Sequence, residues 1–111
     1  MTVLLIGGAY QGKSALARAL YPDLEKVANL HLLVKETLRA GGDPASLLAG
    51  LRGKCVTCDE LGCGVVPLDG ADDKWREQTG RLCCALAAEA DAVARVVAGV
   101  PLFIKGDAPC M

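Results

Sequence analysis

Aromatic side chains and surplus charge are both scarce in this sequence. One Trp, two Tyr and one Phe make up 4% of the 111 residues, so a hydrophobic core has to be built from Ala, Leu and Val. Lys and Arg number 12 against 13 Asp and Glu, which gives a net charge of −1. Proteins that bind nucleic acid over a broad surface typically carry a basic excess. We therefore expect no nucleic-acid partner, and a small anionic ligand fits this composition better.

Long apolar runs are absent as well. No stretch approaches the roughly 20 apolar residues that cross a membrane, and Lys13 interrupts the N-terminal apolar segment. No secretion signal is recognisable, and six cysteines without one are typical of free thiols in the reducing cytosol. We predict a cytoplasmic protein with no membrane span, and a single domain over residues 1–111 because no repeat or linker interrupts the chain.

The sequence is organised around a glycine-rich segment that follows an apolar run and precedes a helical pattern. It matches G-x-x-x-x-G-K-[ST], the phosphate-binding loop (P-loop), with a predicted strand before it and a predicted helix after it. Its glycines let successive backbone N–H groups point into one concavity, and the helix adds the positive end of its dipole. The predicted nucleotide-binding residues are Gly7, Gly8, Ala9, Tyr10, Gln11, Gly12, Lys13 and Ser14.

Two side chains of this loop have predicted chemical roles. Lys13 would reach the β- and γ-phosphates of ATP or GTP, and the Ser14 hydroxyl would hold Mg²⁺. The alternative is an ordinary glycine turn between a strand and a helix. The loop is favoured over that alternative because both the flanking elements and the spacing match it.

Strand and helix patterns alternate along the chain, which predicts an α/β fold. Helices are expected at residues 14–20, 30–40, 44–51 and 71–90, and strands at 3–6, 54–59, 92–98 and 101–105. Residues 24–28 fit a short strand or a first helical turn, and the strand is favoured because Asn29 is a suitable N-cap for the next helix. The expected architecture is P-loop NTPase-like, a mostly parallel sheet with flanking helices and a C-terminal edge hairpin that turns at Gly99.

Two carboxylates follow the predicted strand at residues 54–59. An apolar strand that ends in acidic residues is typical of the Walker B element, in which a carboxylate holds Mg²⁺ directly or through water. Asp59 and Glu60 are therefore the candidate catalytic acids next to Lys13, and Glu60 with Ser14 is the predicted Mg²⁺ site. Of the two carboxylates, the one that does not hold Mg²⁺ could accept the proton of an acceptor hydroxyl. The alternative is a pair of surface carboxylates at a strand end.

The long C-terminal helix carries two arginines on either side of a glycine. Arg76 or Arg81 could contact a phosphate or a neighbouring subunit, or both could lie on a solvated helix face. Their spacing separates them by about 140° around the helix, so we do not expect both to touch one phosphate. Gly80 lies between them and lowers helix stability relative to Ala, which suggests a close backbone approach by another element or a ligand.

Cysteine and histidine offer two further candidates. Cys55, Cys58 and Cys63 could suggest a metal site, with Cys83, Cys84 and Cys110 as further ligands. If residues 54–59 are a strand, however, Cys55 and Cys58 point to opposite faces and cannot share a metal without distortion. His31 lies in an apolar stretch and is interpreted as a packing histidine in preference to a nucleophile.

Four segments together resemble one known family, the adenosylcobinamide kinase/adenosylcobinamide-phosphate guanylyltransferases of cobalamin synthesis. They are GGAYQGKS at 7–14, DELGCGVVP at 59–67, WREQTGRLCCALAAEAD at 75–91 and VARVVAGVPLFIKG at 93–106. The P-loop is common to very many proteins. The E-x-G-x-G-x-V-P stretch, followed by R-x-x-x-G-R in a helix and by the closing hairpin, is much more specific.

The resemblance implies an α/β P-loop enzyme that assembles as a homo-oligomer, typically a trimer. Such enzymes use a nucleoside triphosphate to phosphorylate the aminopropanol hydroxyl of adenosylcobinamide, and then transfer GMP onto that phosphate. By position, residues 7–14 would bind the triphosphate, and Glu60 with Asp59 would serve Mg²⁺ or the acceptor hydroxyl.

The sequence departs from the family between the first helix and the strand at 54–59. Family members are usually longer there, and that segment carries the histidine to which GMP becomes attached. We therefore predict a cobinamide kinase-like enzyme and leave guanylyl transfer in doubt, with GMP attachment at His31 as a weaker hypothesis. The alternative is a nucleotide-binding regulatory or assembly subunit that has lost catalysis.

Overall fold

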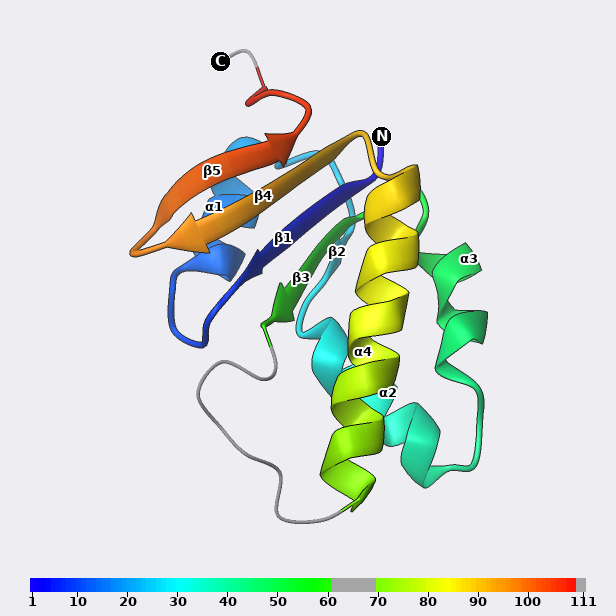
Figure 1. The fold of residues 1–111 in the computed structure, drawn as a ribbon. Helices are drawn as coiled ribbons and strands as arrows, with labels where there is room; N and C mark the ends of the chain where they lie inside the picture. Colours follow the sequence, from blue (N-terminus) through cyan, green and yellow to red (C-terminus); the bar gives the residue numbers. More distant parts are fainter. Residues whose placement is uncertain (61–69, 110–111) are drawn as a thin grey trace.

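The computed structural model of the chain describes residues 1–60 and 70–109, in which a five-stranded sheet is the central layer (Figure 1). The strand order is β2-β3-β1-β4-β5. The strands are β1 (Val3–Gly7), β2 (Lys26–Val27), β3 (Cys55–Asp59), β4 (Ala92–Val97) and β5 (Val100–Lys105). The first four pair in parallel and β5 pairs antiparallel with β4, so the sheet is mostly parallel with an edge hairpin, as predicted.

Helices cover the two faces of this sheet (Figure 1). They are α1 (Lys13–Leu20), α2 (Leu30–Arg39), the short 3-10 segment η1 (Pro44–Leu47) with α3 (Leu48–Leu51), and α4 (Gly70–Glu89). The helix α1 packs on one face, while α2 and α4 contact each other on the other face. The architecture is therefore the α/β, P-loop NTPase-like arrangement that the sequence predicts.

Alternation along the strands divides the core into two clusters, one on each face. In β1, Val3 and Leu5 face α1, whereas Leu4 packs with α2 and α4. In β3, Cys55 belongs to the α1 side and Cys58 to the α2 and α4 side. This confirms the prediction that the two cysteine side chains point to opposite faces of the strand, as residues an odd number of positions apart do.

The other cysteines supply no metal site in the described part of the chain. Cys55, Cys58, Cys83 and Cys84 are free, and no group of three metal-ligating side chains occurs among the described residues. Cys63 and Cys110 lie outside the described residues, as does the glycine-rich stretch from residue 61 to residue 67 that carries most of E-x-G-x-G-x-V-P.

The segment at residues 24–28 contains a strand, as favoured from the sequence, but only Lys26–Val27 pair with β3. Asn29 occupies the N-cap position of α2, yet its side chain makes no capping hydrogen bond. Its backbone has a φ of 59°, and its N–H donates to the Thr57 hydroxyl at 3.1 Å. The cap position was therefore predicted correctly, although the contact that holds it comes from β3.

The close approach of another element that the sequence predicts at Gly80 is wrong for the described residues. A Cβ built on Gly80 has no neighbour within 4 Å among the described residues, and the residue is exposed on α4. The close approach occurs instead at Gly7, where a Cβ would lie 2.5 Å from the carbonyl oxygen of Val96 in β4. The first glycine of the P-loop is thus needed for packing between neighbouring strands.

The hairpin β4–β5 leaves an apolar row uncovered. Four side chains of this row are more than half exposed: Val97, Val100, Leu102 and Ile104. A homo-oligomer, which the family resemblance implies, would cover such a row, and this assembly stays a prediction.

Among the described helices, none is long and apolar enough to cross a membrane.

The two glycines give a matched pair of substitutions. We expect Gly7→Ala to lower the free energy of unfolding by about 1–3 kcal/mol, because the new methyl group collides with rigid backbone of β4. Gly80→Ala should raise it by about 0.5–1 kcal/mol, because an exposed helix interior favours Ala and nothing blocks the methyl group. Urea denaturation followed by circular dichroism measures both, and equal midpoints for the two variants would contradict the packing described here.

A pH dependence follows from the buried thiol of Cys55. Burial raises the pKa of this fully buried group from 9.0 to about 11. Between those values the unfolded chain loses the proton and the folded protein keeps it, so the free energy of unfolding should fall as the pH rises from 9 to 11, by on the order of 2 kcal/mol. Urea midpoints at pH 8 and pH 10.5 measure this loss. Cys55→Val should lose less stability over that interval, and an equal loss would exclude Cys55 as its source.

Candidate functional site

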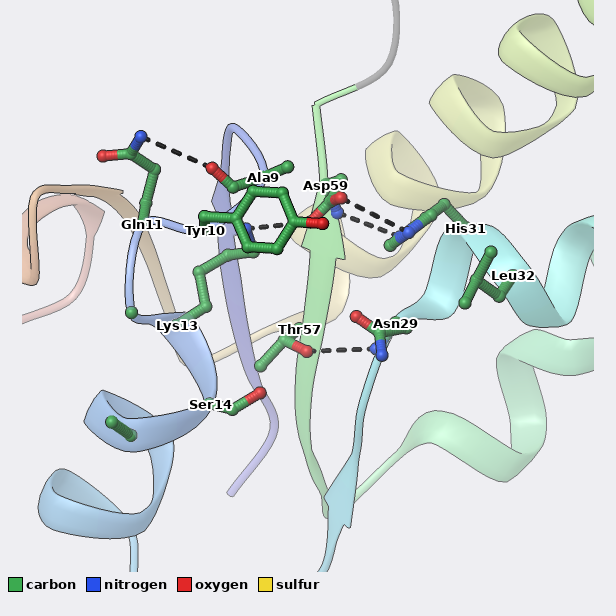
Figure 2. A pocket seen from close by; sticks show the side chains of 12 residues that line it. Ala9, Tyr10, Gln11, Lys13, Ser14, Asn29, His31, Leu32, Thr57 and Asp59 are labelled. Carbon is green, nitrogen blue, oxygen red and sulfur yellow. Dashed lines mark hydrogen bonds and ion pairs between the residues drawn. The ribbon is translucent and has the colours of Figure 1, made fainter.

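A cavity of about 390 Å³ opens at the carboxyl ends of β1 and β3 (Figure 2). Parallel strands bring their carboxyl ends to the same edge of a sheet, and ligands of open α/β sheets bind there. The loop after β1 lines one side of the cavity, the last residues of β3 line its back, and the start of α2 lines the opposite side. Six predicted nucleotide-binding residues line it, and they are Ala9, Tyr10, Gln11, Gly12, Lys13 and Ser14.

The loop is held by its own backbone and by the hairpin. Gly12 has a φ of 84°, which glycine adopts readily, and caps the N-terminus of α1. The Gln11 carbonyl accepts from the N–H of Gly99 at 2.8 Å, and the Gln11 side-chain oxygen accepts from the N–H of Ala98 at 2.6 Å. The turn of the edge hairpin, at Ala98 and Gly99, therefore holds Gln11 of the loop in place.

The ammonium group of Lys13 lies at the centre of the site. The residue is 7% exposed, and its Nζ donates to the carbonyl of Gly8 at 2.6 Å and to that of Gly7 at 3.3 Å. It also forms an ion pair with Asp59 Oδ1 at 2.9 Å. The structure thus brings together the lysine of the loop and the first carboxylate after β3, which lie 46 positions apart in the sequence.

The oxygen atoms around Lys13 suit a magnesium ion. Ser14 and Asp59 line the same cavity, and hydroxyl and carboxylate oxygens are the ligands that Mg²⁺ prefers in proteins. Thr57 lines the cavity as well and presents a further hydroxyl on the same side of β3. The residues present therefore fit an Mg²⁺–nucleotide complex, which Ser14 and Asp59 would hold from this cavity. The sequence predicts Glu60 in place of Asp59 as the second ligand, and the Mg²⁺ site stays a prediction.

His31 contributes a ring that contacts Asp59 twice. Its Nδ1 accepts from the backbone N–H of Asp59 at 3.1 Å, and its Nε2 lies 3.4 Å from Asp59 Oδ2. The residue is 6% exposed, and the indole N–H of Trp75 donates to its carbonyl at 2.7 Å. The packing role predicted for His31 is thus accompanied by a position inside the site, which the sequence analysis raised only through the weaker hypothesis of GMP attachment.

The protonation state of His31 follows from these contacts. Burial lowers the pKa of the imidazole, the Asp59 carboxylate opposes that shift, and the Lys13 ammonium adds to it. Because Nδ1 accepts a hydrogen bond, the proton of the neutral ring is on Nε2, where it faces the carboxylate. A neutral His31 therefore orients both the backbone and the side chain of Asp59.

Glu60 lies apart from the cavity lining. Both of its carboxylate oxygens accept from the Arg95 guanidinium of β4, at 3.0 and 3.2 Å. Its backbone N–H donates to the Gly7 carbonyl at 2.8 Å, so Glu60 ties β3 to the start of the loop. Of the two predicted acids, Asp59 is the one that faces Lys13, and the role of Glu60 in catalysis stays a prediction.

The two arginines of α4 are not among the described residues that line the cavity. Arg81 forms an exposed ion pair with Glu77, one helical turn earlier, at 2.6 Å. Exposed pairs of this kind contribute little to stability. A contact of Arg76 or Arg81 with a neighbouring subunit stays a prediction.

Four lining residues were missed from the sequence. Ala15 directly follows the predicted loop, and the other three are Asn29, Leu32 and Thr57. Asn29 and Leu32 follow the two-residue strand β2, and Thr57 lies within β3. The last three share a position near the carboxyl ends of strands that pair in parallel. For Thr57 the strand at 54–59 was predicted, whereas for Asn29 and Leu32 this signal required the assignment of residues 26 and 27 to the sheet.

Comparison with known proteins identifies one matching family. The model of the family described as cobinamide kinase / cobinamide phosphate guanyltransferase matches residues 43–104, more than half of the chain. The match includes β3, α4 and the hairpin, and it begins after the P-loop. A search of curated proteins finds no matching relative.

The hydrogen bond from the Asp59 N–H to His31 can be tested by stability. Asn and Leu have nearly the same shape, but only Asn offers an oxygen near the position of Nδ1. We expect His31→Leu to be about 1–3 kcal/mol less stable than His31→Asn, because it leaves the Asp59 N–H without an acceptor. Chemical denaturation at pH 7.5 measures the difference, and a Leu variant as stable as the Asn variant would rule out this role.

Proposed function

Because the chain belongs to the cobinamide kinase / cobinamide phosphate guanyltransferase family, we propose that it acts in cobalamin biosynthesis as a kinase that phosphorylates the aminopropanol hydroxyl of adenosylcobinamide. The phosphoryl donor is ATP or GTP. One observation above all supports the kinase step: Lys13 and Asp59 meet at 2.9 Å in a cavity that Ser14 also lines.

The loop and Lys13 bind the donor in this proposal. Backbone N–H groups of the loop and the N-terminus of α1 receive the phosphate oxygens. The Lys13 ammonium exchanges its contact with the Gly8 carbonyl for the β- and γ-phosphates, and it stabilises the charge that develops during transfer. Its burial makes this interaction stronger than it would be in water.

In this proposal Asp59 faces the γ-phosphate from the side opposite the loop, and it has two roles there. It would hold Mg²⁺ together with Ser14, and it would orient the acceptor hydroxyl from its place beside Lys13 in the cavity. When bound, the ion supplies positive charge to the phosphate oxygens. Glu60 is assigned a supporting role, because Arg95 occupies both of its carboxylate oxygens.

Guanylyl transfer is left out of the proposed activity. A histidine that becomes attached to GMP has to present a nitrogen lone pair to the phosphorus atom. In His31 the lone pair of Nδ1 accepts from the Asp59 N–H, and Nε2 carries the proton toward the Asp59 carboxylate. The geometry of this ring favours a positioning role over that of a nucleophile.

The proposed kinase can be tested with cobinamide, MgATP and MgGTP. We expect wild type to form cobinamide phosphate and Lys13→Ala to form it at least about 100-fold more slowly, because the removed ammonium group stabilises the transition state. Lys54→Ala is the matched control, since Lys54 pairs with Glu25 at the other end of β3 and should leave the rate unchanged.

A wild-type rate no higher than that of Lys13→Ala would contradict the kinase. Titration calorimetry with ATP and GTP then separates two explanations. Tight nucleotide binding without turnover would favour the regulatory or assembly subunit, and absent binding would contradict the nucleotide site itself.

A further inference from the structure

Two exposed apolar side chains stand at the mouth of the cavity. Seven large hydrophobic residues are exposed among the described residues. Four of them form the row on the hairpin and one is Met1, whereas Tyr10 and Leu32 line the cavity that holds Lys13. Side chains that the chain leaves uncovered beside a polar centre are available to a ligand.

Tyr10 does not contribute to the packing of residues 1–60 and 70–109. Its side chain is fully exposed, at 103%, and it makes no hydrogen bond among the described residues. Its backbone has a φ of 60°, a left-handed conformation that is uncommon for a bulky residue and costs free energy. Strain of this kind at the rim of a site is consistent with a side chain that is placed for a ligand.

Leu32 stands on the other side of the cavity. It follows His31 in the first turn of α2 and is 48% exposed. In the view of Figure 2 the Tyr10 side chain extends from the loop toward the side on which Asp59, His31 and Leu32 lie. The two apolar side chains therefore flank the Lys13–Asp59 pair.

We propose that Tyr10 and Leu32 form an apolar clamp that binds the body of the phosphoryl acceptor, a bulky and largely planar group that carries the reacting hydroxyl. The placement rests on the proposed function, in which the acceptor approaches from the Asp59 side of the γ-phosphate. Leu32 lies on that side, next to the residue that orients Asp59. An aromatic ring and a branched aliphatic group on opposite sides can contact both faces of a flat molecule.

The test compares cobinamide with 1-amino-2-propanol, which has the hydroxyl without the large body. We expect Tyr10→Ala and Leu32→Ala each to raise the KM for cobinamide about five- to tenfold, the loss that one apolar contact produces. In Leu32→Ala the kcat, the KM for ATP or GTP, and the rate with 1-amino-2-propanol should stay unchanged. In Tyr10→Ala, which alters the nucleotide-binding loop, the KM for cobinamide should rise more than the KM for ATP or GTP. Tyr10→Phe should behave as wild type, because the ring is kept.

Leu102→Ala is the matched control, since Leu102 is a large exposed apolar residue like Tyr10 and Leu32 but lies on the hairpin. Denaturation midpoints of all variants show whether the fold is intact. An unchanged KM for cobinamide in both Ala variants would overturn the clamp. A rise in the KM for the nucleotide instead of cobinamide would overturn it too, because Tyr10 would then stack on the nucleobase.

Equilibrium binding separates the clamp from the kinase. Calorimetric titration of cobinamide into the protein needs no turnover, so it tests the clamp even where no phosphate is transferred. If the protein transfers no phosphate but each Ala variant binds cobinamide five- to tenfold more weakly than wild type, the clamp is supported. The missing turnover then contradicts only the kinase. Absent cobinamide binding to wild type overturns the clamp, whereas phosphorylation of 1-amino-2-propanol would still support the chemistry at Lys13.

Discussion

The buried ammonium group of Lys13 is the interaction on which the arrangement of the site depends. A charge that is 7% exposed is tolerated only where other groups replace its water, and here a carboxylate and two loop carbonyls do so. Those partners come from β3 and from the start of the loop. The ammonium group therefore holds together the end of one strand, the loop after its neighbour, and the helix that follows.

The parallel pairing of β1 with β3 makes this contact possible. The register sets Gly7 opposite Asp59, so the loop begins where the carboxylate side chain emerges. The hairpin supports the loop from the other neighbour of β1, through the backbone contacts of Gln11 with Ala98 and Gly99. The site is thus held by strands on both sides of β1, and residues 98 and 99 belong to the region that the family model matches.

His31 and Tyr10 belong to the same cavity but lie in opposite environments. The imidazole is buried and keeps the Asp59 carboxylate in one orientation. The phenol is fully exposed and packs against nothing within the described chain. A rigid polar interior with an apolar rim suits a substrate that reacts at one hydroxyl and is held by a much larger body.

Most of the fold and the centre of the site were predictable from the sequence, because their signals are local. The P-loop spacing, the apolar strand before Asp59 and the turn at Gly99 each lie within one short segment. The resemblance to the family likewise depends on motifs that are continuous in the chain. Residues outside such motifs, above all Leu32 and Thr57, gave no local signal of their own.

By itself the sequence determined that a phosphate-binding loop, a strand ending in acid and a closing hairpin follow one another in an α/β chain. Only the tertiary structure decided which acid meets Lys13, because Asp59 and Glu60 are adjacent in sequence but point to different partners at the end of β3. It also decided that His31 belongs to the site and that Gly7 is the tightly packed glycine. These outcomes depend on which strand lies beside which, and neighbouring positions in a sheet are set by packing across the whole chain.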